Sequence, residues 1–252
     1  MNIVVVGGGS SGWMTALFCQ RFFPNCNITV IEDSKTGIIG VGESTTPSII
    51  DLLDFIGISV RDLVVNCGAT IKNSVKFTNW NNDGKSYCNG FNPNPELDIF
   101  STSYKTYYTT HNIIWPPHKS LSALKEIYNN NNLDEIHFSA IMSNNNAVPI
   151  DKDTNSHYAS FALHFDAKKF ASYLKKVGKD RQIQIIDSEV VQSNLYENGN
   201  VKSLMLKNGN VVNCDFVFDC SGFARLFVSK TYKSEFKSFK DYLPTKRAIP
   251  FF

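Results

Sequence analysis

The sequence carries almost no excess charge of either sign and lacks any long apolar run. In 252 residues, 25 Lys and Arg stand against 23 Asp and Glu, a net charge of +2. This balance gives no electrostatic reason to expect a nucleic-acid or anionic-membrane partner. No apolar stretch reaches the roughly 18–20 residues needed to cross a bilayer, and the first residues lack the pattern of a signal peptide. We therefore expect a soluble, cytoplasmic protein with no nucleic-acid partner and no membrane partner.

Motifs of metal sites and of common hydrolases are missing as well. The six cysteines include no CxxC pair, which indicates reduced thiols and not a zinc site or a disulfide framework. The five histidines show no HExxH spacing, and no Gly-x-Ser-x-Gly nucleophile elbow occurs. We expect no metal ion. The length is sufficient for the buried core of one domain or of two closely joined ones.

The first 33 residues are the most regular part of the chain. Residues 2–6 are an almost unbroken run of β-branched apolar residues, which is typical of a parallel strand buried on both faces. A glycine-rich turn follows, and residues 13–23 carry apolar side chains at helical spacing. Residues 27–31 repeat the buried-strand pattern and lead into Glu32 and Asp33. The segment therefore predicts a complete β-turn-α-β unit.

The turn in this unit reads Gly7-x-Gly9-x-x-Gly12. Gly7 would allow a tight turn, Gly9 would let a pyrophosphate approach the backbone, and Gly12 would let the helix pack closely on the strand. The N-terminus of the helix offers free N–H groups and a partial positive charge to phosphates. Glu32 would accept hydrogen bonds from the ribose hydroxyls. A purely structural turn is the alternative, but the full context favours dinucleotide binding.

Beyond residue 33, two regular regions flank an irregular one. A glycine-rich loop over 34–46 leads to a helix with Thr46 as N-cap and Pro47 at its first position. Residues 81–160 are rich in Asn, Tyr, Pro and Ser, and we expect an inserted, loop-rich lobe there. The other predicted elements are helices over 60–67, 121–128 and 166–177, strands over 69–80, 183–186 and 216–218, and a three-stranded antiparallel meander with Asn-Gly turns at 198–199 and 208–209.

The last predicted strand delivers a second motif. It runs into Asp219-Cys-Ser-Gly222, which would place a carboxylate and a close-approach glycine beside the same cofactor. A buried strand with an ordinary turn is the alternative. In NAD dehydrogenases further βα units usually follow the glycine-rich unit promptly, whereas here a meander intervenes. This layout resembles the FAD-binding domain of the flavoprotein monooxygenase superfamily, and it favours FAD over NAD.

The fold class that we predict is therefore α/β: an FAD-binding, Rossmann-like βαβ domain with an antiparallel three-stranded meander and an inserted loop-rich lobe. The FAD-binding domain would be discontinuous, with residues 1–80 and 161–252. Residues 81–160 would form the inserted, substrate-facing lobe.

Five segments narrow the family. They are Gly7–Trp13 (GGGSSGW), Gly40–Thr45 (GVGEST) followed by Pro47, Ala69–Trp80 (ATIKNSVKFTNW), Leu163–Leu174 (LHFDAKKFASYL) and Asp219–Leu226 (DCSGFARL). In these segments the chain resembles the flavin-dependent tryptophan halogenases. The tryptophan directly after the third motif glycine, and the strand lysine upstream of Asn79-Trp80, are specific to that family within the superfamily.

The resemblance implies a reaction. In that family a separate flavin reductase supplies FADH2, which with O2 and a halide ion gives hypohalous acid. The hypohalous acid passes down a tunnel to a lysine beside an electron-rich, indole- or tryptophan-like substrate. The matching residue is Lys72, whose ammonium group could polarise hypohalous acid or capture it as a haloamine. A solvated lysine on an edge strand is the alternative for Lys72.

The resemblance also implies where the flavin is bound. Gly40–Thr46 would be a strap between the flavin and the substrate site, and the backbone of Val190 would meet the adenine. The residues expected to bind the cofactor are Gly7, Gly9, Ser10, Ser11, Gly12, Trp13, Glu32, Gly40, Val41, Gly42, Glu43, Val190, Asp219 and Gly222. The resemblance leaves a homodimer open.

The sequence departs from the family pattern in two places. Where relatives that accept free tryptophan usually carry His-Pro-Phe, this chain has Tyr87-Cys-Asn-Gly-Phe91. A different aromatic wall could come from Tyr104, Tyr107, Tyr108 and Trp115, with core packing as the alternative.

The second departure is at the C-terminus. The sequence stops before the Trp-x-Trp-x-Ile-Pro signature, the substrate-side glutamate and the chloride-binding Thr-Gly backbone. We expect a shortened halogenase or the N-terminal portion of one. A flavin monooxygenase and an inactive flavin-binding remnant are the alternatives.

Overall fold

The computed structural model describes residues 1–37, 40, 42–80, 82–91, 138–151, 153, 159–243, 245 and 247. The chain divides into two compact units. The first consists of Met1–Glu43, Leu52–Ala69 and Phe165–Phe252, and the second of Ser44–Asp51 and Thr70–His164. No helix within the described ranges is long and apolar enough to cross a membrane.

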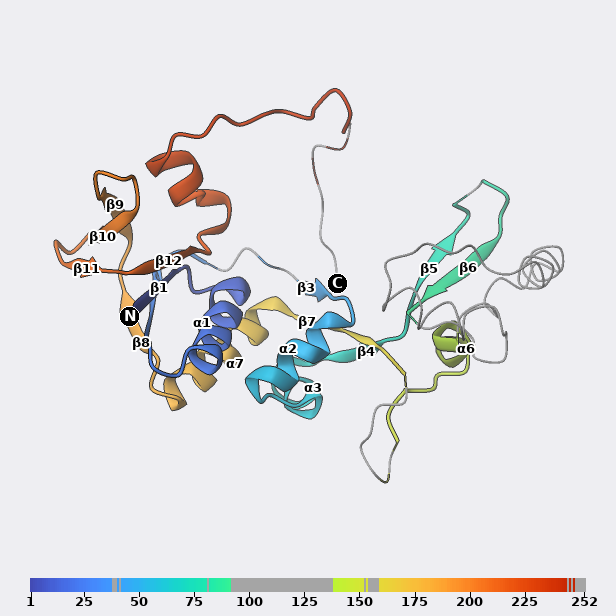
Figure 1. The fold of residues 1–252 in the computed structure, drawn as a ribbon. Helices are drawn as coiled ribbons and strands as arrows, with labels where there is room; N and C mark the ends of the chain where they lie inside the picture. The colour runs from blue at the N-terminus through green and yellow to red at the C-terminus, as the bar shows by residue number, and fades with distance from the viewer. Residues whose placement is uncertain are drawn as a thin grey trace, which may run out of the picture. The chain divides into compact units, whose positions relative to one another are not determined.

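A four-stranded parallel sheet with the order β12-β1-β2-β8 lies at the centre of the first unit (Figure 1). Its strands are β1 (Asn2–Val6), β2 (Asn27–Glu32), β8 (Gln184–Asp187) and β12 (Phe216–Asp219). The side chains of Ile3–Val6 and Ile28–Ile31 are almost completely buried, because both faces of the sheet are covered. The β-α-β unit and the late return of β12 to the edge of β1 confirm the Rossmann-like prediction.

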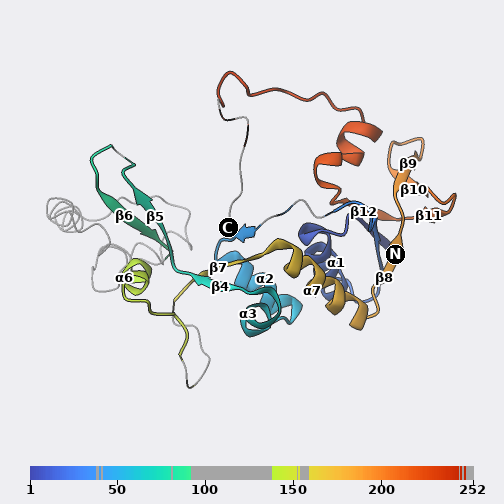
Figure 2. The same ribbon diagram turned by 180° about the vertical axis from the view of Figure 1, so that it is seen from behind.

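Helix α1 (Ser10–Phe22) packs on one face of the sheet, and α7 (Ala167–Asp180) packs along α1 (Figures 1 and 2). The two helices approach closely, since a Cβ atom added at Gly178 of α7 would lie 2.4 Å from Cζ3 of Trp13 in α1. Helix α3 (Val60–Cys67) packs on α7 in turn. A capping box between Ser59 and Asp62 begins α3, and Gly68 ends it in the left-handed conformation.

The predicted meander is present and lies against the opposite face of the sheet. Its strands are β9 (Val190–Leu195), β10 (Val201–Leu206) and β11 (Val211–Asn213), in the order β11-β10-β9. The glycines of both Asn-Gly turns have positive φ, as this class of hairpin turn requires. Leu204 and Leu206 share one buried core with Val4 and Val6 of β1, which places the meander over this face.

The remaining elements are short. They are β3 (Gly42–Ser44), α2 (Ser48–Ile56), β4 (Thr70–Lys72), β5 (Ser74–Thr78), β6 (Ser86–Gly90), α6 (Phe138–Asn144) and β7 (Ala162–Asp166). Strands β3, β7 and β4 form one sheet in that order, and β4 pairs with β7 in antiparallel fashion. Strands β5 and β6 form an antiparallel pair that α6 contacts. After β12 the chain forms a 3₁₀ turn (Gly222–Ala224) and a π-helical turn (Leu226–Thr231).

The prediction of a single strand over residues 69–80 is wrong. The segment breaks at Asn73, whose side-chain amide donates a hydrogen bond to the Ala147 carbonyl oxygen at 2.9 Å. On one side of the break β4 pairs with β7, and on the other β5 pairs with β6. Lys72 and Lys76, which the alternating pattern places on one strand face, therefore belong to different sheets. Lys72 is half-buried and Lys76 is exposed.

Some predicted boundaries shift. Helix α2 begins at Ser48, one residue later than predicted, and the hydroxyls of Thr46 and Ser48 hydrogen-bond to each other at 2.9 Å. The second compact unit combines Ser44–Asp51 with Thr70–His164, and within it β4 pairs with β7; the division into an FAD-binding domain and an inserted lobe over residues 81–160 stays a prediction. The helix predicted over 121–128 lies outside the described residues.

Candidate functional site

The glycine-rich turn joins β1 to α1 at the carboxyl end of the parallel sheet. Gly7 has a φ of 121°, and its N–H donates to the Ile31 carbonyl oxygen at 2.8 Å. A Cβ atom at Gly7 would lie 2.1 Å from the Cys220 carbonyl oxygen, and one at Gly12 would lie 1.8 Å from the Gly7 carbonyl oxygen. These two positions therefore admit only glycine, as the tight turn and the close helix packing require.

Gly9 is different, because it borders open space. A Cβ atom there would meet nothing within 4 Å, and Gly9 is the N-cap of α1. No side-chain cap and no acidic residue occupy this helix start in the described structure, and Ser10 and Ser11 form its first positions. Free N–H groups and a partial positive charge facing open space suit a phosphate group. The residues of the turn therefore fit the pyrophosphate of a dinucleotide.

The second predicted turn lies against the first. The Cys220 N–H donates to the Val6 carbonyl oxygen at 2.8 Å. The Asp219 carboxylate holds this turn together, since its two oxygens accept hydrogen bonds from the N–H groups of Ser221 at 3.1 Å and Phe227 at 2.9 Å. Gly222 follows with a φ of 61° and open space beside it. The structure thus brings the two motifs together at one edge of the sheet.

Glu32 lies beside the glycine-rich turn, at the end of β2. Its side chain is only 9% exposed, and its Oε1 forms an ion pair with Nζ of Lys175 in α7. Its other carboxylate oxygen faces Gly8, where an added Cβ atom would lie 2.1 Å from Oε2. Sequence reasoning missed both Gly8 and Lys175. Its place between the two motif glycines Gly7 and Gly9 is a signal that could have pointed to Gly8, whereas nothing in the sequence marks Lys175.

Other residues predicted to contact the cofactor have different surroundings. Trp13 is completely buried with its ring against Gly178, and its indole Nε1 has no hydrogen-bond partner in the described structure. Val190 is buried at the start of β9. Gly40, Gly42 and Glu43 lie on the connection from β2 to α2, and Val41 lies outside the described residues. The cofactor contacts of these residues stay predictions.

Lys72, in the second unit, ends strand β4. Its Nζ donates a hydrogen bond to the Thr45 carbonyl oxygen at 2.9 Å and lies 5.5 Å from the centroid of the Phe91 ring. The Thr45 hydroxyl is fixed to β7, since it donates to the Leu163 carbonyl oxygen at 3.0 Å and accepts from the Leu163 N–H at 2.9 Å. The structure therefore joins the predicted lysine to the end of the predicted strap.

Sequence reasoning did not single out two further residues near Lys72. The Phe91 N–H donates to the Ser139 hydroxyl at 2.8 Å, which fixes the residue whose ring faces the ammonium group. His164 is paired with Thr70 across the β4–β7 ladder and so lies diagonally from Lys72. Partial burial lowers the pKa of the His164 imidazole, and the positive charge of Lys72 lowers it further.

Two aromatic side chains of the β5–β6 pair contact each other. Tyr87 stacks on Phe77, with ring centroids 5.2 Å apart and an interplanar angle of 18°. The residues predicted as an alternative aromatic wall, Tyr104, Tyr107, Tyr108 and Trp115, lie outside the described residues.

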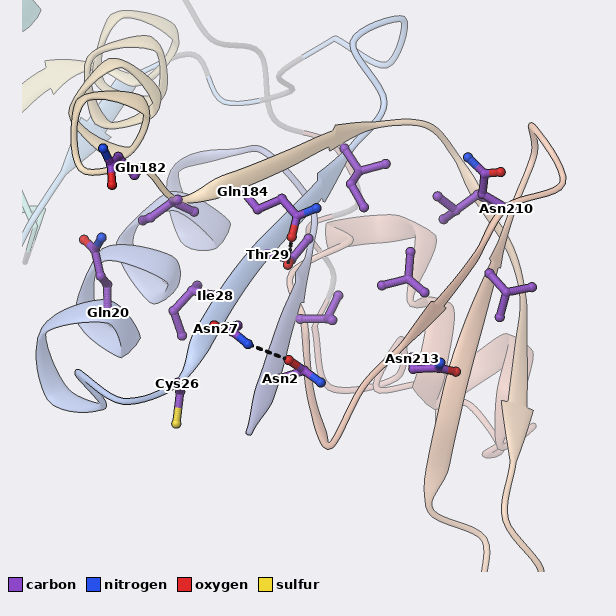
Figure 3. Close-up of a pocket in the computed structure, with 16 residues that line it drawn as sticks. Asn2, Gln20, Cys26, Asn27, Ile28, Thr29, Gln182, Gln184, Asn210 and Asn213 are labelled. Atoms are coloured by element: carbon purple, nitrogen blue, oxygen red, sulfur yellow. Dashed lines mark hydrogen bonds between the residues drawn. The ribbon is translucent and has the colours of Figure 1, made fainter.

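A hollow of about 830 Å³ lies at the opposite end of the parallel sheet from the glycine-rich turn (Figure 3). Most of its labelled side chains are amides, of which Asn2, Asn27 and Gln184 begin strands β1, β2 and β8, and the Asn27 side-chain amide donates to Oδ1 of Asn2 at 3.0 Å. Glu32 and Asp219 lie at the carboxyl ends of β2 and β12, the other end of the same sheet. The hollow is therefore not the predicted cofactor site. Within the described part of the chain, no group of three or more His, Cys, Asp or Glu could hold a metal ion.

The sequence matches the family model described as tryptophan halogenase over residues 2–252. The chain belongs to the tryptophan halogenase family. It is 29% identical over 264 residues to the tryptophan 6-halogenase ThaL of Streptomyces albogriseolus, covering 98% of this chain and 47% of that protein. The tryptophan 7-halogenase RebH of Lentzea aerocolonigenes is 26% identical, with coverage of 98% and 47%.

Solved structures of tryptophan halogenases have the same fold. The crystal structure of the tryptophan 6-halogenase SttH from Streptomyces toxytricini superposes with a TM-score of 0.77 at 25% identity, over 96% of this chain and 46% of that one. This halogenase-family chain thus spans about half the length of the curated relatives it matches.

Proposed function

We propose that this chain carries the flavin site and the lysine of an enzyme that halogenates an electron-rich aromatic, such as the indole of tryptophan. The reaction would use FADH2, O2 and a halide ion, and hypohalous acid would reach the substrate under the control of Lys72. The observation that carries the proposal is the environment of Lys72, whose ammonium group is half-buried between the Thr45 carbonyl oxygen and the Phe91 ring. A merely solvated lysine would resemble exposed Lys76.

The first unit would hold the cofactor. The open N-terminus of α1 at Gly9 would take the pyrophosphate, and Glu32 would accept hydrogen bonds from the adenosine ribose. A separate flavin reductase would supply the cofactor in its reduced form. When bound as FADH2, the flavin would supply two electrons that reduce O2 to the oxidation level of a peroxide. The peroxide-level oxygen would take two further electrons from the halide to give hypohalous acid, and the second oxygen atom would leave as water with a proton from solvent.

Lys72 would act on the hypohalous acid. One of its three N–H bonds is committed to the Thr45 carbonyl oxygen, which leaves two to bind the oxygen of HOX. Such donation withdraws electrons from the oxygen, so that the halogen becomes electrophilic. The aromatic carbon then forms its bond to the halogen, the halogen–oxygen bond breaks, and the oxygen leaves as water with the displaced ring proton. The fixed carbonyl and the Phe91 ring would keep the ammonium group in position.

The substrate class follows from the family and not from a described pocket. The relatives ThaL, RebH and SttH are tryptophan halogenases by name. An indole is electron-rich, as an acceptor of electrophilic halogen must be. Because Phe91 replaces part of the family's usual aromatic segment and contacts Lys72, we propose that it also borders the ring of the substrate.

The test compares Lys72→Ala with Lys76→Ala, a neighbouring exposed lysine on the separate strand β5. The full chain is supplied with a flavin reductase, NADH, FAD, O2, chloride or bromide, and tryptophan or indole. Products are analysed by mass spectrometry, and FAD binding is measured separately. We expect a halide-dependent halogenated product, a loss of roughly a hundredfold or more in Lys72→Ala, and no change in Lys76→Ala. FAD affinity should not change in either variant.

Three outcomes would contradict the proposal. Undiminished halogenation by Lys72→Ala would remove the role of this lysine. A halide-independent gain of oxygen would identify a flavin monooxygenase. FAD binding without any product from the unmodified chain would identify an inactive flavin-binding remnant.

A further inference from the structure

The carboxyl ends of β2 and β8 place two acidic residues side by side. Glu32 and Asp187 are register partners on these adjacent parallel strands. The Asp187 carboxylate accepts hydrogen bonds from the N–H of Ser34 at 2.9 Å and from its hydroxyl at 2.7 Å, which lower the pKa of Asp187. The positive charge of Lys175 lowers it further. Lys175, which also pairs with Glu32, therefore balances two neighbouring negative charges.

The packing of α7 against α1 positions Lys175. It lies three residues before Gly178 in α7, so both residues belong to the same side of the helix. Gly178 lets the ring of Trp13 come so close that a single added Cβ atom would overlap it. This contact fixes how far α7 is shifted and rotated against α1, and α1 begins at the glycine-rich turn. The Trp13–Gly178 contact therefore determines where the Lys175 ammonium group meets Glu32.

The carboxylate of Glu32 is consequently held from two sides. Lys175 pairs with Oε1, and the backbone of Gly8 lies against Oε2. An ionised carboxylate has about four lone-pair sites, so the ion pair leaves several free for hydroxyl donors. Burial of a carboxylate without a partner is unfavourable, so without Lys175 the Glu32 carboxylate would turn toward solvent.

We propose that Lys175 is a positioning residue of the cofactor site: it holds the Glu32 carboxylate in the orientation in which it can bind the ribose hydroxyls of the adenosine half of FAD. The inference rests on the proposed flavin site. It assigns to Trp13, the tryptophan that distinguishes the family motif, a role in helix packing that acts on the cofactor through α7.

The test uses ADP and 2′,3′-dideoxy-ADP, which share the adenine and pyrophosphate but differ in the ribose hydroxyls. Their dissociation constants are measured by titration calorimetry for the full chain and for Lys175→Met, Lys175→Arg and Glu32→Gln. Lys176→Met is the matched control, since Lys176 is exposed on the same helix. FAD is titrated in parallel, and urea unfolding monitors the fold of each variant.

We expect the unmodified chain to prefer ADP over the dideoxy analogue by roughly ten- to a hundredfold, as hydrogen bonds to a charged group allow. Lys175→Met should weaken ADP and FAD about tenfold and reduce the preference to a few-fold at most, as should Glu32→Gln. Lys175→Arg should keep most of the preference, and Lys176→Met all of it. In the Lys175→Met background, Glu32→Gln should add little.

Different results would overturn the proposed flavin site and the proposed role of Lys175. If the unmodified chain binds neither ADP nor FAD, the flavin site and this inference are both overturned. If it binds both nucleotides and Lys175→Met shows the same preference or a tighter affinity, only the role of Lys175 is overturned. A Lys175→Met protein that is less stable but keeps the preference for the ribose hydroxyls would likewise show a structural role only.

Discussion

The contact between Gly178 and Trp13 makes a quantitative prediction for the substitution Gly178→Ala. The added Cβ atom would lie 2.4 Å from Cζ3 and 3.0 Å from Cε3 of the indole, whereas carbon atoms in contact are about 3.5–4.0 Å apart. The two helices must therefore separate by roughly an ångström, or the ring must leave its rotamer. Trp13 is completely buried, so the neighbouring core would have to move with it.

Two opposing effects set the size of the change. Replacing a helical glycine by alanine stabilises a helix by about 1 kcal/mol, while overpacking a core costs about 1–3 kcal/mol. Because the added atom would lie only 2.4 Å from the ring, the overpacking cost should fall in the upper part of this range, at about 2–3 kcal/mol, so we expect Gly178→Ala to lower the free energy of unfolding by about 1–2 kcal/mol. At roughly 2–4 °C per kcal/mol for a domain of this size, the Tm should fall by a few degrees. Ser172→Ala, on an exposed position of α7, is the control and should be neutral or slightly stabilising.

A double-mutant cycle isolates the contact. Trp13→Phe shortens the ring at this point, which leaves a cavity, and also removes a buried N–H without a partner in the described structure; the cycle subtracts the effect of this substitution alone. In the Trp13→Phe background, Gly178→Ala should cost at least about 1 kcal/mol less than in the unmodified chain. Urea unfolding of the four proteins gives these values. A Gly178→Ala effect that is identical in both backgrounds, or that matches Ser172→Ala, would refute the packing argument.

Two further predictions follow from the site. Gly9→Ala should lower the Tm by a few degrees at most, because the added Cβ atom meets nothing within 4 Å and the only cost is that alanine is a poorer N-cap than glycine. It should weaken FAD binding about tenfold or more by filling the space proposed for the pyrophosphate, and unchanged FAD affinity in a fluorescence titration would contradict this placement. His164 has a lowered pKa, so the folded state binds fewer protons than the unfolded state just below the unfolded pKa of about 6.5. The free energy of unfolding should therefore be unaffected by His164 above about pH 6.5 and should decrease as the pH falls from there to the lower, folded-state pKa of this imidazole. The urea midpoint should depend less on pH in this range in His164→Gln than in the unmodified chain.

Local features of the sequence predict the first unit well. The run of β-branched residues before Gly7, the helical spacing after Gly12 and the Asn-Gly turns each depend on residues a few positions apart. The structure confirms β1, α1, β2 and the meander accordingly. The break at Asn73 has only a weak signal in the sequence, one polar residue at an apolar position, and the alternation resumes in the same phase at Val75. The bond from Asn73 to the distant Ala147 carbonyl oxygen, which accompanies the break, has no signal in the local pattern.

The same limit explains what was missed around the site. Lys175 fits the polar face of an amphipathic helix, and its sequence position says nothing about Glu32, which is 143 residues away along the chain. Phe91 comes close to Lys72 only because β5 and β6 pair after the break at Asn73. Partners of this kind are set by tertiary packing and not by periodicity.

The two lysines of the site illustrate how a functional cation differs from a solvated one. Lys72 and Lys175 each have a neighbour of the same type nearby, Lys76 and Lys176, that is exposed to solvent. Sequence pattern treats both members of each pair alike, yet within the described residues only the first member of each is held by a specific oxygen, the Thr45 carbonyl oxygen or the Glu32 carboxylate. Because these lysines lie in different compact units and have different partners in the part of the chain that the structure describes, their substitutions should act independently: one on the transfer of halogen, the other on the binding of the adenosine. Such a separation would be hard to explain if either lysine served only solubility.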